Sequence, residues 1–508
     1  MPLILAAGTD VDCGGFMTAN APKALSTGNI TEEDMNVVLR RLFRMRIRLG
    51  QFDPPGALQR IGAESVCNEY ALELARDGVR QSAVLAKNAG GMLPLSAAAI
   101  ASAVVIGPIV DYTGWTYCEV ASGPRQRQQT QARAHPVPPP PLRPSDYGGA
   151  PCNGSEWTAL DAIKQHIPGA TGVKGVPSVG SNDTSGVAAA AAAAAAADLV
   201  FLAIGSNLDL EAEGHDRLII DFSDGQKALI AAVTAAAKKP VVAIVASGGA
   251  MDVSSLLANP NIGAILIVGS PSIQIVGAGD VIFGATLDGR AVSPAGRMSQ
   301  MTYPADYVNQ VSMFDFGMRP GPSAWPPGTN PGRTYRFYTG TPVLPFGFGL
   351  SYTTFTYTPL PDPHPPAVAG ARRRTVDLAA VRAAAEAHAA TGVVGHIPAG
   401  LKETAADFWV NVTNTGAVDS DDVVLGFLVP PGAGTGGVPL QELFGFERVF
   451  VPAGQTVTVY LGAQGVRFTQ PDVDGVRRTL PGEYTARFGV KETAEGGMGF
   501  AEVKLLAM

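Results

Sequence analysis

The stretch that decides the fold is Leu199-Val-Phe-Leu-Ala-Ile204, an unbroken apolar run followed directly by the polar loop Gly205-Ser-Asn-Leu-Asp-Leu-Glu-Ala-Glu-Gly-His-Asp-Arg217. Similar short apolar runs recur at Ala103–Ile106, Val241–Val245 and Ala264–Val268. Helical patterns separate these runs, among them Gly225–Ala237 and the alanine run Ala188–Ala197. Apolar strands that alternate with helices indicate parallel strands covered on both faces. The sequence therefore predicts an α/β sandwich with a mainly parallel sheet.

Towards the C-terminus, the apolar spacing changes to a period of two. Phe408, Val410 and Val412 alternate with polar or amphipathic residues, and a second alternation follows at Val457, Val459 and Leu461. Clusters of glycine, proline and asparagine separate these segments, as expected for antiparallel strands joined by turns. We predict an antiparallel β-sandwich over residues 403–508. Residues 358–402 are of low complexity and are predicted as a linker that carries one short helix near 378–390.

Upstream of the α/β region, residues 1–10 are predicted as a strand that runs into an acidic loop. Thr31, followed by three acids, predicts the start of a helix that ends at Gly50. A further helix is expected through residues 70–87. One strand and one helix cannot bury two faces, so we interpret residues 1–55 as the last repeat of a larger α/β structure whose other repeats would precede residue 1.

Composition and charge exclude several classes of protein. Of the 508 residues, 46% are hydrophobic and only 16% are charged, which argues against wholesale disorder. The net charge of −7 and the scarcity of basic clusters argue against non-specific binding of nucleic acid or of an anionic membrane. Residues 122–148, rich in glutamine, arginine and proline, are predicted as a disordered insert. We predict no membrane span and recognise no signal peptide in this chain.

The same inspection predicts neither a metal site nor a cofactor. The four cysteines form no CxxC pair, and the six histidines form no HExxH motif. No phosphate-binding glycine loop opens a helix, and no GxSxG elbow is present.

The loop 205–217 is the strongest candidate for chemistry, because loops beyond the carboxyl ends of parallel strands bind ligands. If the loop is extended, Asp209, Glu211 and Glu213 project to one side, with His215 and Arg217 close enough to pair with them. Clustered carboxylates repel one another, so that one stays protonated near neutrality, as a general acid requires. The alternative is an ordinary solvated acidic loop, which the residue types alone favour. The acids of Asp10-Val-Asp12 are similar, and a purely structural role is favoured there.

Seven motifs in order along the chain resemble one family. They are Ala6-Ala-Gly-Thr-Asp-Val-Asp-Cys-Gly14, Arg48-Leu-Gly-Gln-Phe-Asp53, Val84-Leu-Ala-Lys-Asn88, Glu211-Ala-Glu-Gly-His-Asp-Arg217, Asp280-Val-Ile-Phe-Gly284, Pro331-Gly-Arg-Thr-Tyr-Arg-Phe-Tyr338 and Pro345-Phe-Gly-Phe-Gly-Leu-Ser-Tyr352. Their order resembles the β-xylosidase branch of glycoside hydrolase family 3, of the plant and fungal type. The stretch 408–490 is similar to the fibronectin type III domain of that branch.

The resemblance implies three domains. Residues 1–55 would be the remnant of a (β/α)₈ barrel, 65–357 an (α/β)₆ sandwich, and 403–508 a fibronectin type III-like β-sandwich. It also implies an extracellular or cell-wall location.

The resemblance further implies hydrolysis of non-reducing terminal β-glycosides with retention, which uses two carboxylates about 5–5.5 Å apart. The Glu-Gly-x-Asp-Arg pattern assigns the general acid/base to Glu213, with Glu211 as the fallback. Xylo-oligosaccharides are the expected substrates, and α-L-arabinofuranosidase or β-glucosidase activity is the alternative. A non-catalytic glycan-binding protein of the cell wall is an alternative from a different class. No residue is assigned to substrate binding.

The sequence also departs from the family pattern. The family's nucleophile is an aspartate in a Ser-Asp motif just upstream of the segment that matches residues 6–14. The two Ser-Asp pairs of this chain, Ser145-Asp146 and Ser223-Asp224, lie in the wrong domain. The glycine-rich stretch expected before Asp280 is replaced by Ser270-Pro-Ser-Ile-Gln-Ile-Val276. We therefore expect these 508 residues to be inactive by themselves.

Overall fold

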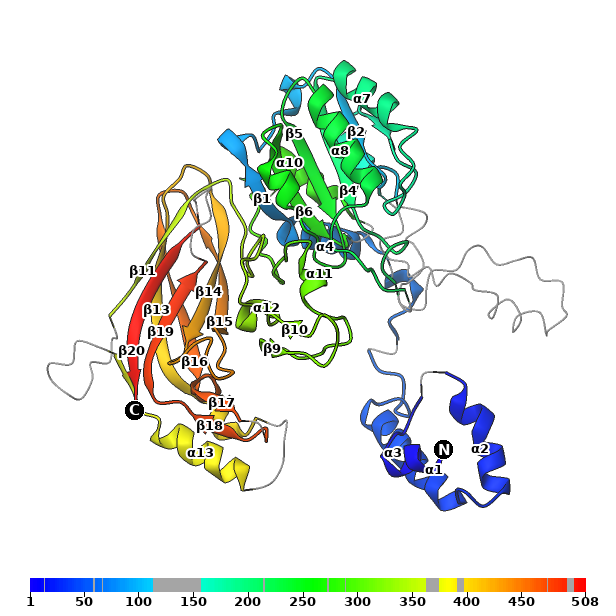
Figure 1. Ribbon diagram of the computed structural model, residues 1–508, viewed down its shortest axis with the longest axis vertical. Helices are drawn as coiled ribbons and strands as arrows, with labels where there is room; N and C mark the ends of the chain where they lie inside the picture. Colours follow the sequence, from blue (N-terminus) through cyan, green and yellow to red (C-terminus); the bar gives the residue numbers. More distant parts are fainter. Residues whose placement is uncertain are drawn as a thin grey trace. The chain divides into compact units, whose positions relative to one another are not determined.

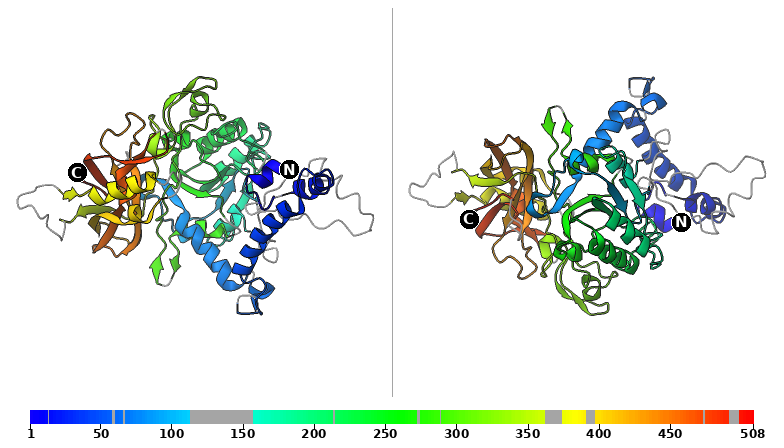
Figure 2. Two further views of the ribbon diagram at one scale, coloured as in Figure 1. Left: turned by 90° about the horizontal axis from the view of Figure 1, so that it is seen from below. Right: turned by 90° about the horizontal axis from the view of Figure 1, so that it is seen from above.

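The structure is a computed structural model and is shown in Figures 1 and 2. It describes residues 1–12, 14–57, 60–65, 67–112, 157–212, 215–271, 274–287, 289–361, 374–390, 397–472, 474–490 and 498–508. The predicted insert 122–148 lies outside these ranges. The chain divides into two units, Met1–Glu69 and Tyr70–Met508, and each is described by itself.

The first unit contains the helices α1 (Pro2–Ala6), α2 (Phe16–Ser26) and α3 (Glu32–Arg48). The helix predicted after Thr31 is confirmed: the Asp34 N–H donates to the Thr31 hydroxyl at 3.2 Å, and the Thr31 N–H donates to the Asp34 carboxylate at 2.8 Å. The predicted N-terminal strand is wrong, since residues 2–6 form α1. A lone parallel strand has no neighbour to bond its backbone, whereas a helix closes its own hydrogen bonds. The barrel assignment stays a prediction.

The second unit begins with a six-stranded sheet in the order β1-β6-β5-β4-β2-β3 (Figure 1). Its strands are β1 (Val84–Asn88), β2 (Ala103–Ile106), β3 (Thr171–Val173), β4 (Leu199–Gly205), β5 (Val241–Ala246) and β6 (Ile262–Gly269). Neighbouring strands from β6 to β3 pair in parallel, and β1 pairs antiparallel with β6 at the edge. The mainly parallel sheet is therefore confirmed.

Helices cover this sheet, as the apolar strands require. They are α4 (Glu69–Ser82), α6 (Ala159–Lys164), α7 (Val187–Ala196), α8 (Asp224–Ala236), α9 (Ser254–Ala258) and α10 (Val276–Phe283). The alanine run forms α7, which packs beside α8, while α6 packs beside α10. None of the helices in the described ranges is long and apolar enough to cross a membrane.

The helix predicted for residues 70–87 is wrong in its last third. α4 ends at Ser82, and Val84–Asn88 form the edge strand β1. Local propensity did not indicate this strand, because its formation depends on pairing with β6. Lys87 is buried there, and its ammonium group donates to the carbonyls of Leu257 and Asn259 at 2.8 and 2.9 Å.

The strand order changes direction at β2. The chain passes from β2 outward to β3 and then returns to β4 on the other side of β2. Loops at such a switch point diverge and leave a crevice at the carboxyl ends of the strands. The acidic loop 205–217 starts at this point, because it follows β4 directly. Gly205 adopts a φ of +143°, and a Cβ there would collide with the Ala246 carbonyl, so the start of the loop requires glycine.

The segment that follows the sheet connects it to the second domain of the unit. Its short elements are β7 (Thr286–Leu287), β8 (Arg290–Ala291), α11 (Tyr307–Gln310), β9 (Gly321–Pro322), β10 (Thr329–Asn330) and α12 (Thr334–Phe337). Arg297 forms an ion pair with the fully buried Asp422, which also accepts a hydrogen bond from Tyr357 at 2.7 Å. Arg336 forms an ion pair with Glu442. The motif 331–338 thus joins the two domains.

The second domain is a β-sandwich (Figures 1 and 2). One sheet has the order β11-β13-β16 and the other β12-β20-β19-β14-β15. The strands are β11 (Phe355–Pro359), β12 (Arg374–Val376), β13 (Thr404–Asn414), β14 (Ser420–Val429), β15 (Glu442–Val451), β16 (Thr456–Gln464), β19 (Gly482–Gly489) and β20 (Phe500–Ala507), with a hairpin of β17 (Thr469–Pro471) and β18 (Arg477–Thr479). Phe408, Val410 and Val412 face the core, as their two-residue period predicts.

The predicted linker 358–402 is ordered in part. It contains α13 (Ala379–Ala389), as predicted, and α14 (Ala399–Lys402). Leu378, Val381, Ala385 and Leu401 are buried in the core of the β-sandwich. The described part of this segment therefore packs against the β-sandwich and is not a flexible linker. Its apolar side chains are small and widely spaced, so the sequence pattern does not indicate this packing.

Candidate functional site

The candidate site begins with a tight turn after β4. The N–H groups of Leu210 and Glu211 donate to the Asn207 carbonyl at 3.0 and 3.2 Å. The Asn207 side chain accepts from the Asp209 N–H at 3.0 Å, which favours a turn over an extended chain. The condition of an extended loop is therefore not met at residues 207–211, and Asp209 does not line up with Glu211 as alternate residues of a strand would.

Glu211 is held by three donors from two loops. Its Oε1 accepts from the Ser206 hydroxyl and, at 3.1 Å, from the Gly249 N–H, while its Oε2 lies 3.4 Å from Arg217 Nε. The side chain of Glu211 is 23% exposed and that of Arg217 only 9%. The carboxylate therefore fastens the acidic loop to the loop that follows β5, and both of its oxygens are engaged.

A side chain at Gly249 would press against the ends of two neighbouring side chains. A Cβ at this position would lie 2.7 Å from Arg217 Nη2 and 2.9 Å from Glu211 Oε2. Ser247 supports this arrangement, since its hydroxyl contacts both the Ser206 hydroxyl at 2.7 Å and the Gly249 carbonyl. The two strand-end loops thus form one hydrogen-bonded unit.

Arg217 contributes a buried positive charge. Its Nη2 donates to the Ala250 carbonyl at 2.9 Å, and its buried Nη1 has no hydrogen-bond acceptor among the described residues. Burial lowers the pKa of Arg217, and the Glu211 carboxylate acts in the opposite direction. A buried N–H without a partner is costly in a finished structure and is common where a ligand or substrate supplies the acceptor.

The other predicted site residues are Glu213, His215 and Asp209. Glu213 lies outside the described residues, so its predicted role is untested. Ala212 and His215 flank residues 213–214 and pair with each other through two backbone hydrogen bonds of 2.9 and 3.0 Å. His215 and Asp209 are exposed, and among the described residues of this loop the structure brings Glu211 and Arg217 together as an ion pair.

A cavity of about 460 Å³ lies beside these loops, at the carboxyl ends of β5 and β6. Polar residues that line it include Ser247, Ser270, Arg297, Gln300 and Thr302, with Gly248 and Gly249 between them. Its size is that of a small-molecule site. Sequence reasoning missed Ser247 and Ser206, although both directly follow buried strands and the strand-end rule used for the acidic loop applies to them equally.

Two other motifs are structural. Asp280 is 2% exposed and accepts hydrogen bonds from Arg76 and Arg80, which bind α10 to α4. In the first unit, Asp12 accepts from the Met17 N–H at 3.2 Å, and Asp10 lies 3.2 Å from Arg41. The acids of residues 10–12 therefore stabilise that unit internally, as the sequence favoured.

Comparison with known proteins agrees with these features. The profile of the glycosyl hydrolase family 3 C-terminal domain matches residues 83–352, more than half of the chain. The chain is 33% identical over 450 residues to β-xylosidase/α-L-arabinofuranosidase 2 of Medicago sativa, covering 88% of this chain and 51% of that protein. It is 32% identical over 491 residues to the exo-1,4-β-xylosidase bxlB of Emericella nidulans, covering 96% and 56%. The chain thus spans about half the length of the curated relatives it matches.

Solved structures show the same fold. A GH3 exo-β-xylosidase (XlnD) bound to a xylobiose aziridine activity-based probe superposes with a TM-score of 0.78 at 26% identity, covering 99% of this chain and 57% of that chain. A β-glucosidase from Listeria innocua in complex with glucose has a TM-score of 0.68 at 19% identity, covering 99% and 59%, and supports the fold alone.

Proposed function

The chain belongs to glycosyl hydrolase family 3, and from this premise we propose that it carries the acid/base half of a retaining β-xylosidase. Xylo-oligosaccharides are the proposed substrates, from which the complete active site would release xylose at non-reducing ends. The observation that carries the proposal is the anchored acidic loop at the switch point of the sheet, beside the cavity at the ends of β5 and β6.

Within this loop we assign the general acid/base to Glu213 and a positioning role to Glu211. Both oxygens of Glu211 are engaged by Ser206, Gly249 and Arg217, so this carboxyl group is committed to holding the loop. An acid/base group must instead exchange its proton with the glycosidic oxygen and with water. The geometry thus weakens the fallback assignment of Glu211.

The mechanism follows from the two-carboxylate scheme. Glu213 would protonate the leaving oxygen while a carboxylate nucleophile attacks the anomeric carbon, forming a glycosyl-enzyme. Glu213 would then remove a proton from the water that releases the sugar and regenerates the nucleophile. The fixed positive charge of Arg217 near the loop would favour the carboxylate form of Glu213 in the second step.

Of the two Ser-Asp pairs of this chain, the one that the structure describes has a structural role. Ser223 caps α8 by accepting from the Gln226 N–H at 3.3 Å, and Asp224 forms an ion pair with Lys227 in the first turn of that helix. Ser145-Asp146 lies outside the described residues. We therefore propose that the 508 residues alone do not hydrolyse glycosides and that the nucleophile comes from a barrel domain.

The test is a chimera in which residues 83–352 of this chain replace the matching segment of the Emericella nidulans exo-1,4-β-xylosidase. The chimera should hydrolyse 4-nitrophenyl β-D-xyloside, and E213Q should reduce kcat/KM about 10²- to 10⁴-fold and remove the limb of the pH–rate profile that reports the general acid. E211Q is the matched control, with a smaller loss and an unchanged profile shape. Full activity of E213Q, or loss of the limb only in E211Q, would contradict the assignment.

The alternative substrate is an α-L-arabinofuranoside. The name of the Medicago sativa relative combines both activities, and the glycone-binding residues are not assigned in this chain. The same chimera, assayed against 4-nitrophenyl α-L-arabinofuranoside and β-D-glucoside, discriminates the three specificities. Binding of xylan by the isolated chain, with no turnover by any chimera, would favour the non-catalytic glycan-binding alternative.

We also propose an extracellular or cell-wall location. Cys67 is disulfide-bonded, a bond that persists in oxidising compartments. The sequons Asn29-Ile-Thr31, Asn182-Asp-Thr184 and Asn411-Val-Thr413 lie in described residues, and Asn153-Gly-Ser155 lies outside them. Glycosidase treatment of the protein purified from its native source would shift its electrophoretic mobility if these sequons are used.

A further inference from the structure

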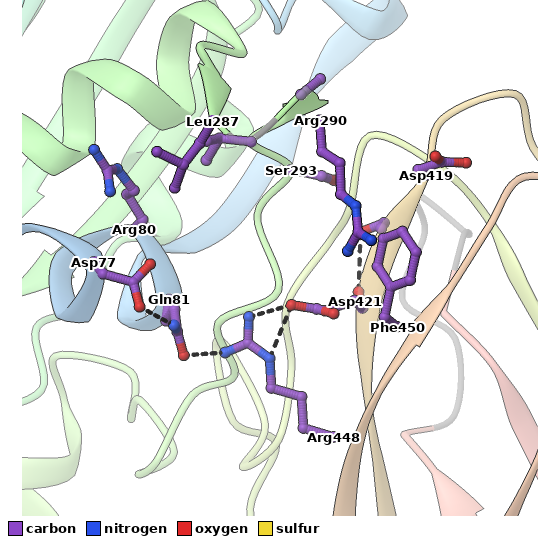
Figure 3. A pocket seen from close by; sticks show the side chains of 13 residues that line it. Asp77, Arg80, Gln81, Leu287, Arg290, Ser293, Asp419, Asp421, Arg448 and Phe450 are labelled. Carbon is purple, nitrogen blue, oxygen red and sulfur yellow. Dashed lines mark hydrogen bonds and ion pairs between the residues drawn. The ribbon is translucent and has the colours of Figure 1, made fainter. Parts of the chain in front are cut away.

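A second cavity, of about 400 Å³, lies between α4, the β7–β8 hairpin and the β-sandwich (Figure 3). α4 contributes Asp77, Arg80 and Gln81, the hairpin and the residues directly after it contribute residues 287 and 290–293, and Asp419 with the β14 and β15 strands contributes the rest. The cavity thus sits at the junction of the α/β domain and the β-sandwich, a common location for small-molecule sites.

The charges that line this cavity balance. Three guanidinium groups (Arg80, Arg290 and Arg448) face three carboxylates (Asp77, Asp419 and Asp421). Arg448 lies 2.5 Å from Asp421, and Arg80 is paired with Asp280 and Glu73 outside the cavity. Because groups of both signs line the cavity, the lining favours a neutral, polar ligand.

Two of these side chains keep unused hydrogen-bonding capacity. The Arg290 guanidinium stacks on the Phe450 ring at 4.1 Å from its centroid, and within the described ranges no acceptor binds its N–H groups. Asp419 accepts from the Ala453 N–H at 2.8 Å through one oxygen, and among the described residues its other oxygen has no donor. The cavity therefore offers guanidinium donors and a carboxylate acceptor, which can bind the hydroxyl groups of a sugar.

The same cavity has an apolar surface. Phe450 lies beside Arg290 in Figure 3, and Leu287, 39% exposed, lies on the hairpin wall. Pyranose rings combine hydroxyl groups on their edge with apolar C–H groups on their faces. The lining therefore complements both the neutral hydroxyl groups and the apolar face of a pyranose ring.

We propose that this cavity is a second saccharide site that binds a neutral pyranose ring of a mono- or disaccharide, with Arg290 donating to one hydroxyl and Asp419 accepting from another. The site is separate from the acidic loop, whose residues do not line it. Gln81 and Arg448 line both cavities, and they contact each other at 2.6 Å. Arg290 and Asp419 line only the second cavity, so they are the residues to vary.

The experiment measures binding of D-xylose and xylobiose to the 508-residue protein by calorimetry and by saturation-transfer NMR. The choice of xylobiose as the probe rests on the proposed function. Every variant carries Glu213→Gln, so that neither turnover nor binding at a working catalytic site contributes to the measured signal. The variants are Arg290→Ala and Asp419→Ala, and the matched control is Arg478→Ala, an exposed hairpin arginine paired with Asp472.

Saturable binding that weakens at least tenfold in both variants and stays unchanged in the control supports the proposal. Equal binding in all variants, or no saturable binding of either sugar to the parent, would overturn it. Inorganic phosphate is the charged comparator, and tighter binding of phosphate that is lost in Arg290→Ala would show an anion site instead. Thermal melts check folding, and Asp419→Asn serves if an alanine variant does not fold.

The two proposals fail separately. If the chimera is inactive in the nitrophenyl assay while xylobiose still binds through Arg290 and Asp419, only the proposed function is contradicted. If the chimera is active but no binding depends on Arg290, only the second saccharide site is contradicted.

Discussion

Two acid–arginine clusters in the α/β domain are built from the same residue types but differ in their surroundings. In the α4–α10 cluster, Asp280 is 2% exposed and receives hydrogen bonds of 2.6–2.7 Å from Arg76 and Arg80, with His166 at 3.5 Å. In the acidic loop, Glu211 lies 3.4 Å from Arg217 and accepts from Gly249, which lines a cavity, and Arg217 Nη1 has no acceptor among the described residues. The first cluster joins two helices, and the second leaves a donor of Arg217 unused.

This difference provides a criterion for separating structural from functional charged residues within one domain. Both clusters are partly buried and both appear in motifs, so neither burial nor composition distinguishes them. What distinguishes them, among the described residues, is whether the hydrogen bonds of the arginine are completed.

The largest expected effect is at Asp280. Asp280→Asn leaves Arg76 and Arg80 without their shared carboxylate, and Arg80 is buried, so the free energy of unfolding should fall by about 3–5 kcal/mol. Urea unfolding of the second unit within the intact chain measures the loss. Asp472→Asn, which breaks a surface pair with Arg478, is the control and should cause a much smaller loss. A loss at Asp280 no larger than the control would remove the distinction between the clusters.

The contribution of Asp280 to the free energy of unfolding should be lost at acidic pH. Burial alone would raise the pKa of Asp280, but hydrogen bonds from His166, Arg76 and Arg80 outweigh burial and hold this pKa well below its usual range. Because the folded-state pKa lies below the unfolded one, the contribution is complete above about pH 5 and decreases as the pH falls through about 4 and below. The stability difference between the parent and Asp280→Asn should therefore shrink from pH 7 to pH 3. A constant difference would refute the linkage.

Gly249→Ala should have an intermediate effect, at the acidic loop. The added Cβ would press against Arg217 Nη2 and Glu211 Oε2, and we expect a loss of roughly 1–3 kcal/mol together with displacement of the loop. Gly78→Ala in α4 is the control, since no atom lies within 4 Å of its Cβ position, and alanine there should stabilise the helix by about 0.5–1 kcal/mol. Unchanged stability of Gly249→Ala would mean that the two loops are not packed as a unit.

The smallest effect on stability is expected at Glu211. Glu211→Gln keeps an acceptor for Ser206 and Gly249 but removes the charge opposite Arg217, so the loss should be about 1 kcal/mol. The exposed Glu447→Gln on β15 is the control, with a change near zero. A loss at Glu211 as large as that at Asp280 would place both clusters in the same structural class.

The sequence by itself determined the elements whose signals are local. The apolar strands β2, β4, β5 and β6, the capped helix α3, the alanine helix α7 and the alternating strand β13 all carry their period or cap in adjacent residues. The sequence motifs also indicated the family, which the match over residues 83–352 shows. The pairing of Arg217 with an acid of the same loop followed from proximity along the chain.

Only the tertiary structure decided features that depend on distant partners. Residues 84–88 form a strand because β6 offers an edge, and residues 2–6 form a helix because the described residues of their unit include no strand with which they could pair. Glu211 became an anchor because Gly249, distant in sequence, donates to it across the loop that follows β5. The cavity between α4 and the β-sandwich unites residues from 77 to 450. Hydrogen bonds and cavities between remote segments leave no periodic trace in the sequence, which is why the fold class could be predicted while these contacts could not.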